Sequence, residues 1–117
     1  MKAVLLVSHG SRSPQTKQEV ESLLEVLKSK SDISIFEYAF LELETPDIPE
    51  GISSCVRQKA TDIRVLLNFL NSGRHVNEDI PAIVEECRKE FPGVKITISK
   101  PVGQHPAVSY LFLDMIE

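Results

Sequence analysis

The stretch that decides the fold is Lys2 to Arg12, KAVLLVSHGSR, in which an apolar run ends abruptly in polar residues. The five apolar residues from Ala3 to Val7 are typical of a short strand buried on both faces of a parallel sheet. The loop that follows holds His9 beside a glycine. Ligands of open α/β sheets bind at the carboxyl ends of the strands, so the pattern predicts a functional edge at His9.

Beyond this stretch the apolar periodicity alternates between strand and helix. We predict further strands at 33–40, 63–69 and 94–98, and helices at 14–28, 49–60, 79–91 and 106–116. Right-handed crossovers turn such a chain into an α/β three-layer sandwich, with a four-stranded parallel sheet and helices on both faces. The commonest short arrangement has strand order 2-1-3-4, and the alternating fourth strand suits an edge.

This strand order predicts that three polar loops meet at one edge of the sheet. His9 follows the first strand, Glu42 follows the second, and His75 lies in the loop 70–78 after the third. Two imidazoles and a carboxylate can ligate a metal or accept protons. Each residue alone also fits an ordinary loop side chain, and Glu44, two residues after Glu42, keeps that alternative open for the acid.

Charged residues beside the histidines suggest what the site binds. Arg12 and Arg74 suit a ligand with several carboxylates, because guanidinium groups bind carboxylates through paired hydrogen bonds, although either arginine can be a bystander. We expect Asp79 to cap the third helix. We expect His105 to open the last helix, with contact to a ligand as its second role.

Composition limits the class of protein. A chain of 117 residues, 42% hydrophobic and 26% charged, predicts one globular domain spanning residues 1–117. Its net charge of −4 argues against general binding to nucleic acid or anionic membranes. Neither a membrane span nor a cleavable signal is evident, which favours a cytoplasmic protein. Cys55 and Cys87 match no metal-ligand spacing, so we expect two reduced, packed thiols.

Four segments in the expected order resemble the sirohydrochlorin chelatase family, in its short CbiX/SirB-type form. They are LLVSHGSR at 5–12, FLELETPDIPEGI at 40–52, FLNSGRHVNEDIP at 69–81 and KPVGQHPAV at 100–108. The resemblance implies a class II-type chelatase, which inserts a divalent metal into a metal-free tetrapyrrole without ATP. Cobalt insertion into sirohydrochlorin is the expected reaction, as a step of cobalamin, sirohaem or nickel-tetrapyrrole synthesis. The metal is then a substrate, and no prosthetic group is expected.

The resemblance also implies roles for individual residues. The catalytic and metal-binding histidines of the family correspond to His9 and His75, and its acidic residue corresponds to Glu42. The predicted substrate-binding set is Ser11, Arg12, Ser72, Gly73, Arg74 and His105. A chain of this length resembles the single-domain form of the family, which works as a homodimer.

Two other functions compete with the chelatase. The Leu6 to Gly10 segment resembles the opening of histidine phosphatases, but Ser8 replaces the arginine that would bind the phosphoryl group. The second alternative is a module that binds metal or tetrapyrrole without turnover, since a fold and its site can persist without activity.

Overall fold

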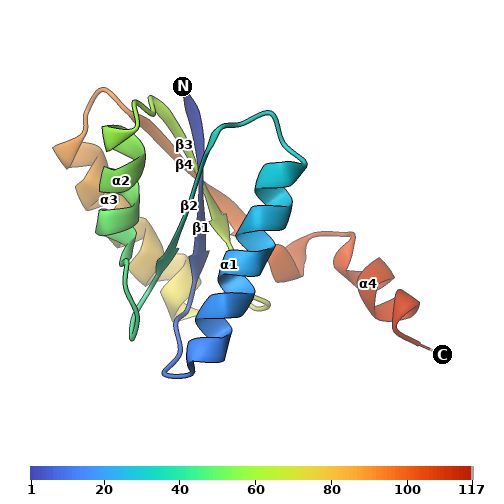
Figure 1. The fold of residues 1–117 in the computed structure, drawn as a ribbon. Coiled ribbons are helices and arrows are strands. Elements are labelled where there is room, and N and C mark those ends of the chain that lie inside the picture. Colours follow the sequence, from blue (N-terminus) through green and yellow to red (C-terminus); the bar gives the residue numbers. More distant parts are fainter. Residues whose placement is uncertain (117) are drawn as a thin grey trace.

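The computed structural model describes residues 1–116, and within them four parallel strands form one sheet in the order β2-β1-β3-β4 (Figure 1). This confirms the predicted α/β fold and strand order. The elements, in chain order, are β1 (Lys2–Ser8), α1 (Pro14–Ser29), β2 (Ile35–Phe40), α2 (Ile48–Arg57), β3 (Asp62–Leu67), a π-helical turn (His75–Asp79), α3 (Ile80–Glu90), β4 (Lys95–Pro101), a 3-10 turn (Val102–Gln104) and α4 (Val108–Asp114).

Helices cover both faces of the sheet, as expected. Helix α1 lies on one face, and α2 and α3 lie on the other (Figure 1). Alternate residues of β1 point to opposite faces of the sheet. Leu6 packs with Val20 and Leu24 of α1. Leu5 and Val7 belong to the larger core under α2 and α3. The apolar run at the start of the chain is therefore buried on both faces, as is typical of a central strand in a parallel sheet.

Helix α2 begins and ends earlier than its apolar spacing predicted. It starts at Ile48 because Asp47 and Glu50 form a reciprocal capping box, in which each side chain accepts the other residue's backbone N–H. It ends at Arg57, and Lys59 then adopts a left-handed φ of 78°. Gly51 lets α2 lie close to the sheet, since a Cβ there would come within 2.8 Å of a methyl group of Leu5.

The prediction for residues 70–81 was partly wrong. His75 to Asp79 form a π-helical turn that runs directly into α3, so His75 lies in a helix rather than in a loop. Asp79 does not cap α3, because its side chain makes no capping hydrogen bond. Pro81 lacks an N–H and cannot donate to the carbonyl four residues earlier, which accounts for a widened turn at this point.

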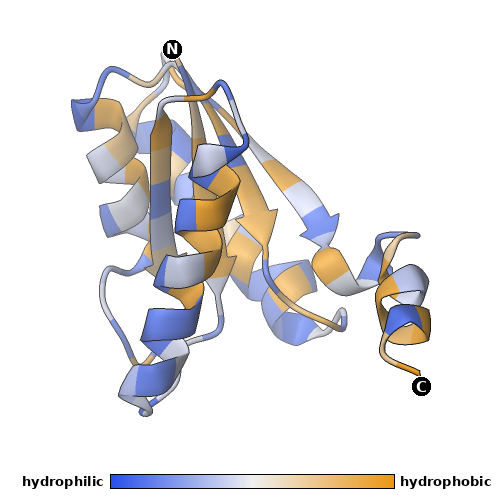
Figure 2. Cartoon of the chain, turned by 45° about the vertical axis from the view of Figure 1, so that its right-hand side comes forward, coloured by the Kyte–Doolittle hydropathy of each residue, from blue (hydrophilic) through white to orange (hydrophobic). Residues whose placement is uncertain are grey.

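Helix α4 also differs from the expected closing helix. It spans Val108–Asp114 rather than 106–116 and projects away from the sheet (Figure 1). Its exposed residues are largely apolar (Figure 2). They include Tyr110, Leu111, Phe112 and Leu113, each at least 60% exposed. Along residues 1–116, no helix has both the length and the apolar character needed to cross a membrane.

Candidate metal centre

The carboxyl ends of three adjacent strands bring two imidazoles and a carboxylate together. Strand β1 lies between β2 and β3, so the loops after all three meet at one edge of the sheet. His9 follows β1, Glu42 follows β2 and His75 opens the π-helical turn after β3. One potential ligand atom from each residue lies within 4.8 Å of the other two. The juxtaposition expected from topology is therefore present.

His9 and Glu42 contact each other directly. His9 Nε2 lies 2.9 Å from Glu42 Oε1, and both side chains are about half exposed. The backbone supports the pair, because the N–H of Glu42 donates to the carbonyl of His9 at 3.0 Å. The Leu41 N–H likewise donates to the Ser8 carbonyl at 2.9 Å, which extends the pairing of β1 and β2 into the two loops. The sheet thus positions the acid opposite the histidine.

Gly10 permits the close approach of these two loops. Its φ of 104° is a conformation that residues with side chains rarely adopt. A Cβ at Gly10 would also lie 1.8 Å from the carbonyl oxygen of Glu42, which is closer than any real contact. Glycine is therefore required here by both the backbone conformation and the neighbouring loop.

His75 completes the cluster from the other side of β1. Its ring centroid lies 5.3 Å from that of His9, and the rings are inclined at 61°. Phe69 contacts the His9 ring edge to face, with centroids 6.4 Å apart. Asp79 Oδ2 lies 2.7 Å from His75 Nδ1, one turn further along the same helical segment. The His75 ring is thus held by a carboxylate that is itself outside the cluster.

Asn68 ties the ends of β1 and β3 together beneath the cluster. Its side-chain amide donates to the hydroxyl of Ser8 at 3.0 Å, and its backbone N–H donates to the Val7 carbonyl at 2.8 Å. Ser8 is 5% exposed, so its hydroxyl depends on a protein partner. The two bonds fix the strand end from which His9 projects.

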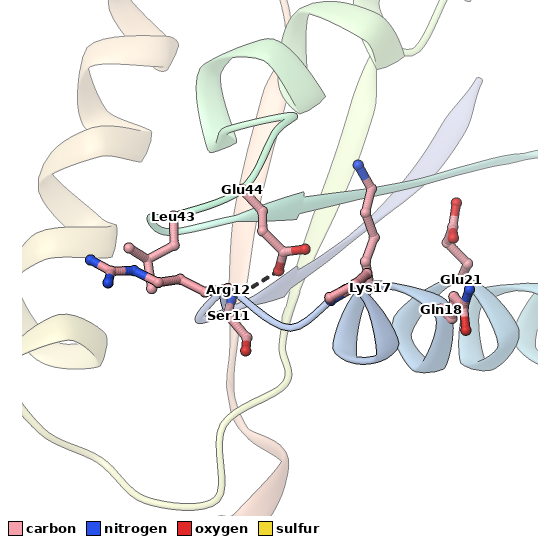
Figure 3. Close-up of a pocket in the computed structure, with 8 residues that line it drawn as sticks. Ser11, Arg12, Lys17, Gln18, Glu21, Leu43 and Glu44 are labelled. Atoms are coloured by element: carbon pink, nitrogen blue, oxygen red, sulfur yellow. Dashed lines mark hydrogen bonds between the residues drawn. The ribbon is translucent and has the colours of Figure 1, made fainter.

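Two of the predicted substrate-binding residues, Ser11 and Arg12, line an open pocket of about 590 Å³, together with Leu43 and Glu44 from the loop that carries Glu42. Glu44 accepts a hydrogen bond from the Ser11 N–H at 2.9 Å, and the Arg12 side chain extends toward Leu43 (Figure 3). Lys17 of α1 also lines the pocket, and its ammonium donates to the Thr45 carbonyl at 2.9 Å. The pocket therefore offers two cationic side chains, together with the carboxylates of Glu21 and Glu44.

The other predicted substrate-binding residues make local contacts. Arg74 Nε lies 3.2 Å from Glu78 Oε2 on the π-helical turn. The hydroxyl of Ser72 accepts a hydrogen bond from Gln104, and the carbonyl of Gly73 accepts the N–H of Asn77 at 2.8 Å. These contacts hold the loop that precedes His75 in the chain.

His105 serves the last helix, as expected. Its Nδ1 accepts the N–H of Ala107 at 3.0 Å, immediately before α4. It is not among the three clustered residues.

The cysteines are buried, free thiols, as predicted. Burial raises the pKa of Cys55 from 9.0 to about 12, and the negative charge of Glu37 contributes in the same direction. Burial also raises the pKa of Cys87. Neither thiol belongs to the cluster, and the raised pKa disfavours the thiolate that ligation or nucleophilic attack would require.

Two nitrogen ligands and one oxygen ligand suit divalent cobalt, nickel, iron or zinc. All three side chains are exposed, so both an ion and a larger molecule can reach them. Sequence patterns did not reveal the contacts of Asp79, Lys17 and Glu44. The spacing of His75 and Asp79 by four residues would have signalled their pairing if a helix had been assigned there.

The fold and the cluster together define an α/β protein with a candidate metal centre at the carboxyl edge of its sheet. The CbiX family model matches residues 3–117, and the chain belongs to this family of sirohydrochlorin chelatases.

Some relatives are named as iron chelatases and others as cobalt chelatases. A sirohydrochlorin ferrochelatase of Bacillus subtilis is 38% identical over 86% of this chain and 39% of its own length. A sirohydrochlorin cobaltochelatase of Methanococcus aeolicus is 36% identical over 97% of this chain and 96% of its own. The chain spans less than half the length of several relatives that it matches, including that from Bacillus subtilis.

Solved structures share the fold. The sirohydrochlorin chelatase SirB from Bacillus subtilis subspecies spizizenii, in complex with cobalt, superposes with a TM-score of 0.84 at 34% identity, covering 97% of this chain and 50% of SirB. A CbiX protein of cobalamin biosynthesis from Marinobacter aquaeolei gives a TM-score of 0.83 at 27% identity, covering 98% of this chain and 93% of its own.

Proposed function

We propose that the chain inserts a divalent metal, most favourably cobalt, into sirohydrochlorin without ATP. The observation that carries this proposal is the cluster of His9, Glu42 and His75 at the edge of the sheet. Relatives named as sirohydrochlorin cobaltochelatases and ferrochelatases support the substrate. A neighbour solved with cobalt and another solved with Fe3+ support metal binding in this fold. The metal is a substrate, so the proposal needs no prosthetic group.

Insertion requires a metal held by exchangeable ligands and acceptors for two pyrrole protons. In the proposed reaction His9 and His75 hold the ion through neutral imidazole nitrogens. His9 Nε2 cannot bind Glu42 and a metal at once, so metal entry must separate the pair that lies 2.9 Å apart. The released carboxylate of Glu42 then serves as a third ligand or accepts one of the two pyrrole protons, and the remaining proton or protons pass to solvent, which reaches these exposed side chains.

An acidic tetrapyrrole also needs cations beside the metal. Arg12 and Lys17 present positive charge in the pocket that Leu43 and Glu44, from the loop carrying Glu42, also line. We propose that they bind peripheral carboxylates of the substrate, with Ser11 beside them. Ser72, Gly73, Arg74 and His105 complete the proposed substrate contacts; for Arg74 this requires release from Glu78.

The test is an insertion assay with cobalt, nickel and iron in parallel, followed through the absorption spectrum of sirohydrochlorin. The proposal expects insertion without ATP, fastest with cobalt. Tight binding of metal or sirohydrochlorin without a spectral change to the metallated product would favour the non-catalytic module. Hydrolysis of an aryl phosphate without insertion would favour the phosphatase, which Ser8 makes a poor candidate because it brings no positive charge to the site.

We also propose that this single domain works as a homodimer in which α4 contacts the second copy. The support is the exposed apolar surface of α4, because a helix with large apolar side chains on its surface normally packs against another element. Light scattering after size-exclusion chromatography should give a dimer for the wild type and a monomer for Leu111→Glu/Phe112→Glu. A monomeric wild type would contradict the assembly.

A cytoplasmic location is part of the same proposal. The buried thiols of Cys55 and Cys87 are consistent with a reducing compartment. Cell fractionation with an antibody against the chain would test it, and recovery outside the cytoplasm would contradict it.

A further inference from the structure

The contact between Asp79 and His75 determines which nitrogen of the imidazole can bind a metal. Asp79 Oδ2 lies 2.7 Å from His75 Nδ1. An ionised carboxylate only accepts hydrogen bonds, so Nδ1 carries the hydrogen in this pair. The Nδ1-protonated tautomer of His75 is thus assigned from its hydrogen bond to Asp79. In neutral His75 the remaining nitrogen, Nε2, then keeps its lone pair and is the atom available as a ligand.

The contact joins the first and last residues of the π-helical turn. The N–H of Ile80 donates to the carbonyl of His75, five residues earlier, so the turn starts at the histidine itself. Asp79 makes no capping hydrogen bond to α3, which leaves its carboxylate available to the imidazole. Both side chains are nearly half exposed, and such exposed side-chain contacts within a helix contribute little to stability. A structural role alone therefore explains the contact poorly.

His9 is held in a different way. Its Nδ1 lies 3.2 Å from the carbonyl of Gly10, and its Nε2 faces Glu42, which belongs to the cluster. The ligand nitrogen of His9 thus becomes free only when Glu42 moves. His75 is held by a residue outside the cluster, so its orientation does not have to change when an ion binds.

We propose that Asp79 is a positioning residue for metal binding, which fixes the tautomer and orientation of His75 so that Nε2 is ready to ligate the ion. The inference rests on the metal-binding role proposed above for His75. Carboxylates that orient ligating histidines typically change metal affinity by roughly 10- to 100-fold when they are removed. We expect an effect of that size here.

The first test observes the imidazole in the metal-free protein. Long-range ¹H–¹⁵N correlation spectra at mildly alkaline pH distinguish the two neutral tautomers. The wild type is expected to show His75 protonated on Nδ1, and Asp79→Ala is expected to show a mixture. Asp79→Asn should keep the wild-type tautomer, because its side-chain oxygen still accepts the hydrogen bond. The signals of His9 should be the same in all three proteins. An unchanged His75 tautomer in Asp79→Ala would overturn the proposal.

The second test measures the dissociation constant for Co²⁺ by calorimetry. Asp79→Ala is expected to weaken binding roughly 10- to 100-fold, and Asp79→Asn is expected to recover most of the loss. The matched control is Glu86→Ala, which removes a carboxylate of α3 that pairs with Lys89. Wild-type affinity in Asp79→Ala would overturn the proposal. If Asp79→Ala does not fold, an Asp79→Asn protein with the affinity of His75→Ala would overturn it.

These outcomes are separable from failure of the proposed function, because neither readout uses sirohydrochlorin. A wild-type chain that binds cobalt and responds to Asp79→Ala, yet inserts no metal, would refute the chelatase and support the positioning role. Wild-type cobalt affinity in His75→Ala would overturn the positioning role together with the ligand assignment.

Discussion

Replacing Gly10 by alanine should disrupt the metal centre without touching any of its three side chains. The new Cβ would lie 1.8 Å from the Glu42 carbonyl oxygen, whereas real Cβ contacts essentially never fall below 3.0 Å, so the loop must retreat by about 1.2 Å. If the carboxylate follows its backbone, its separation from His9 grows from 2.9 Å to about 4 Å. Misplacements of this size can cost roughly 100-fold in a preorganised site.

The backbone adds a second cost. A residue with a side chain at the φ of 104° found at Gly10 is strained, and strain of this kind costs about 1–3 kcal/mol. We therefore expect Gly10→Ala to unfold at lower urea concentration and to bind Co²⁺ roughly 10- to 100-fold more weakly by calorimetry. The control is Gly93→Ala, whose Cβ would meet nothing within 4 Å. Wild-type cobalt affinity in folded Gly10→Ala would refute the claim that this glycine sets the position of Glu42.

Three further outcomes are expected. Glu42→Gln should slow cobalt insertion and weaken cobalt binding. A wild-type insertion rate together with wild-type cobalt affinity would show that Glu42 is an acidic loop residue without a role in the site. Asn68→Ala should lower the free energy of unfolding in urea by about 1–3 kcal/mol, because the buried hydroxyl of Ser8 loses its hydrogen-bond donor. Asn71→Ala should leave that free energy almost unchanged, because Asn71 is exposed. The stability of the wild type should fall as pH rises from 9.0 towards about 12, because the unfolded chain releases the Cys55 proton first; an equal fall in Cys55→Ala would contradict this cause.

The sheet was predictable because its signal is local. The apolar run of β1 is typical of a strand buried on both faces, and the alternation of strands with helices then restricts the topology. Once β1 lies between β2 and β3, the meeting of His9, Glu42 and His75 follows from the strand ends alone.

The details of the site were not predictable because they depend on contacts between distant segments. The overlap between a Cβ at Gly10 and Glu42 exists only when the two loops have folded together. Pro81 and Asp79 resemble the start of a helix, so the sequence pattern concealed the π-helical turn in which Asp79 contacts His75. The apolar residues of α4 predicted a helix, but periodicity cannot say which surface the helix will contact.

The central claim is that His9 and His75 together carry metal insertion, and the most direct measurement is the rate of cobalt insertion into sirohydrochlorin. We expect His9→Ala and His75→Ala each to lose activity while circular dichroism and thermal unfolding remain those of a folded α/β protein. Wild-type insertion rates in both folded variants would contradict the account.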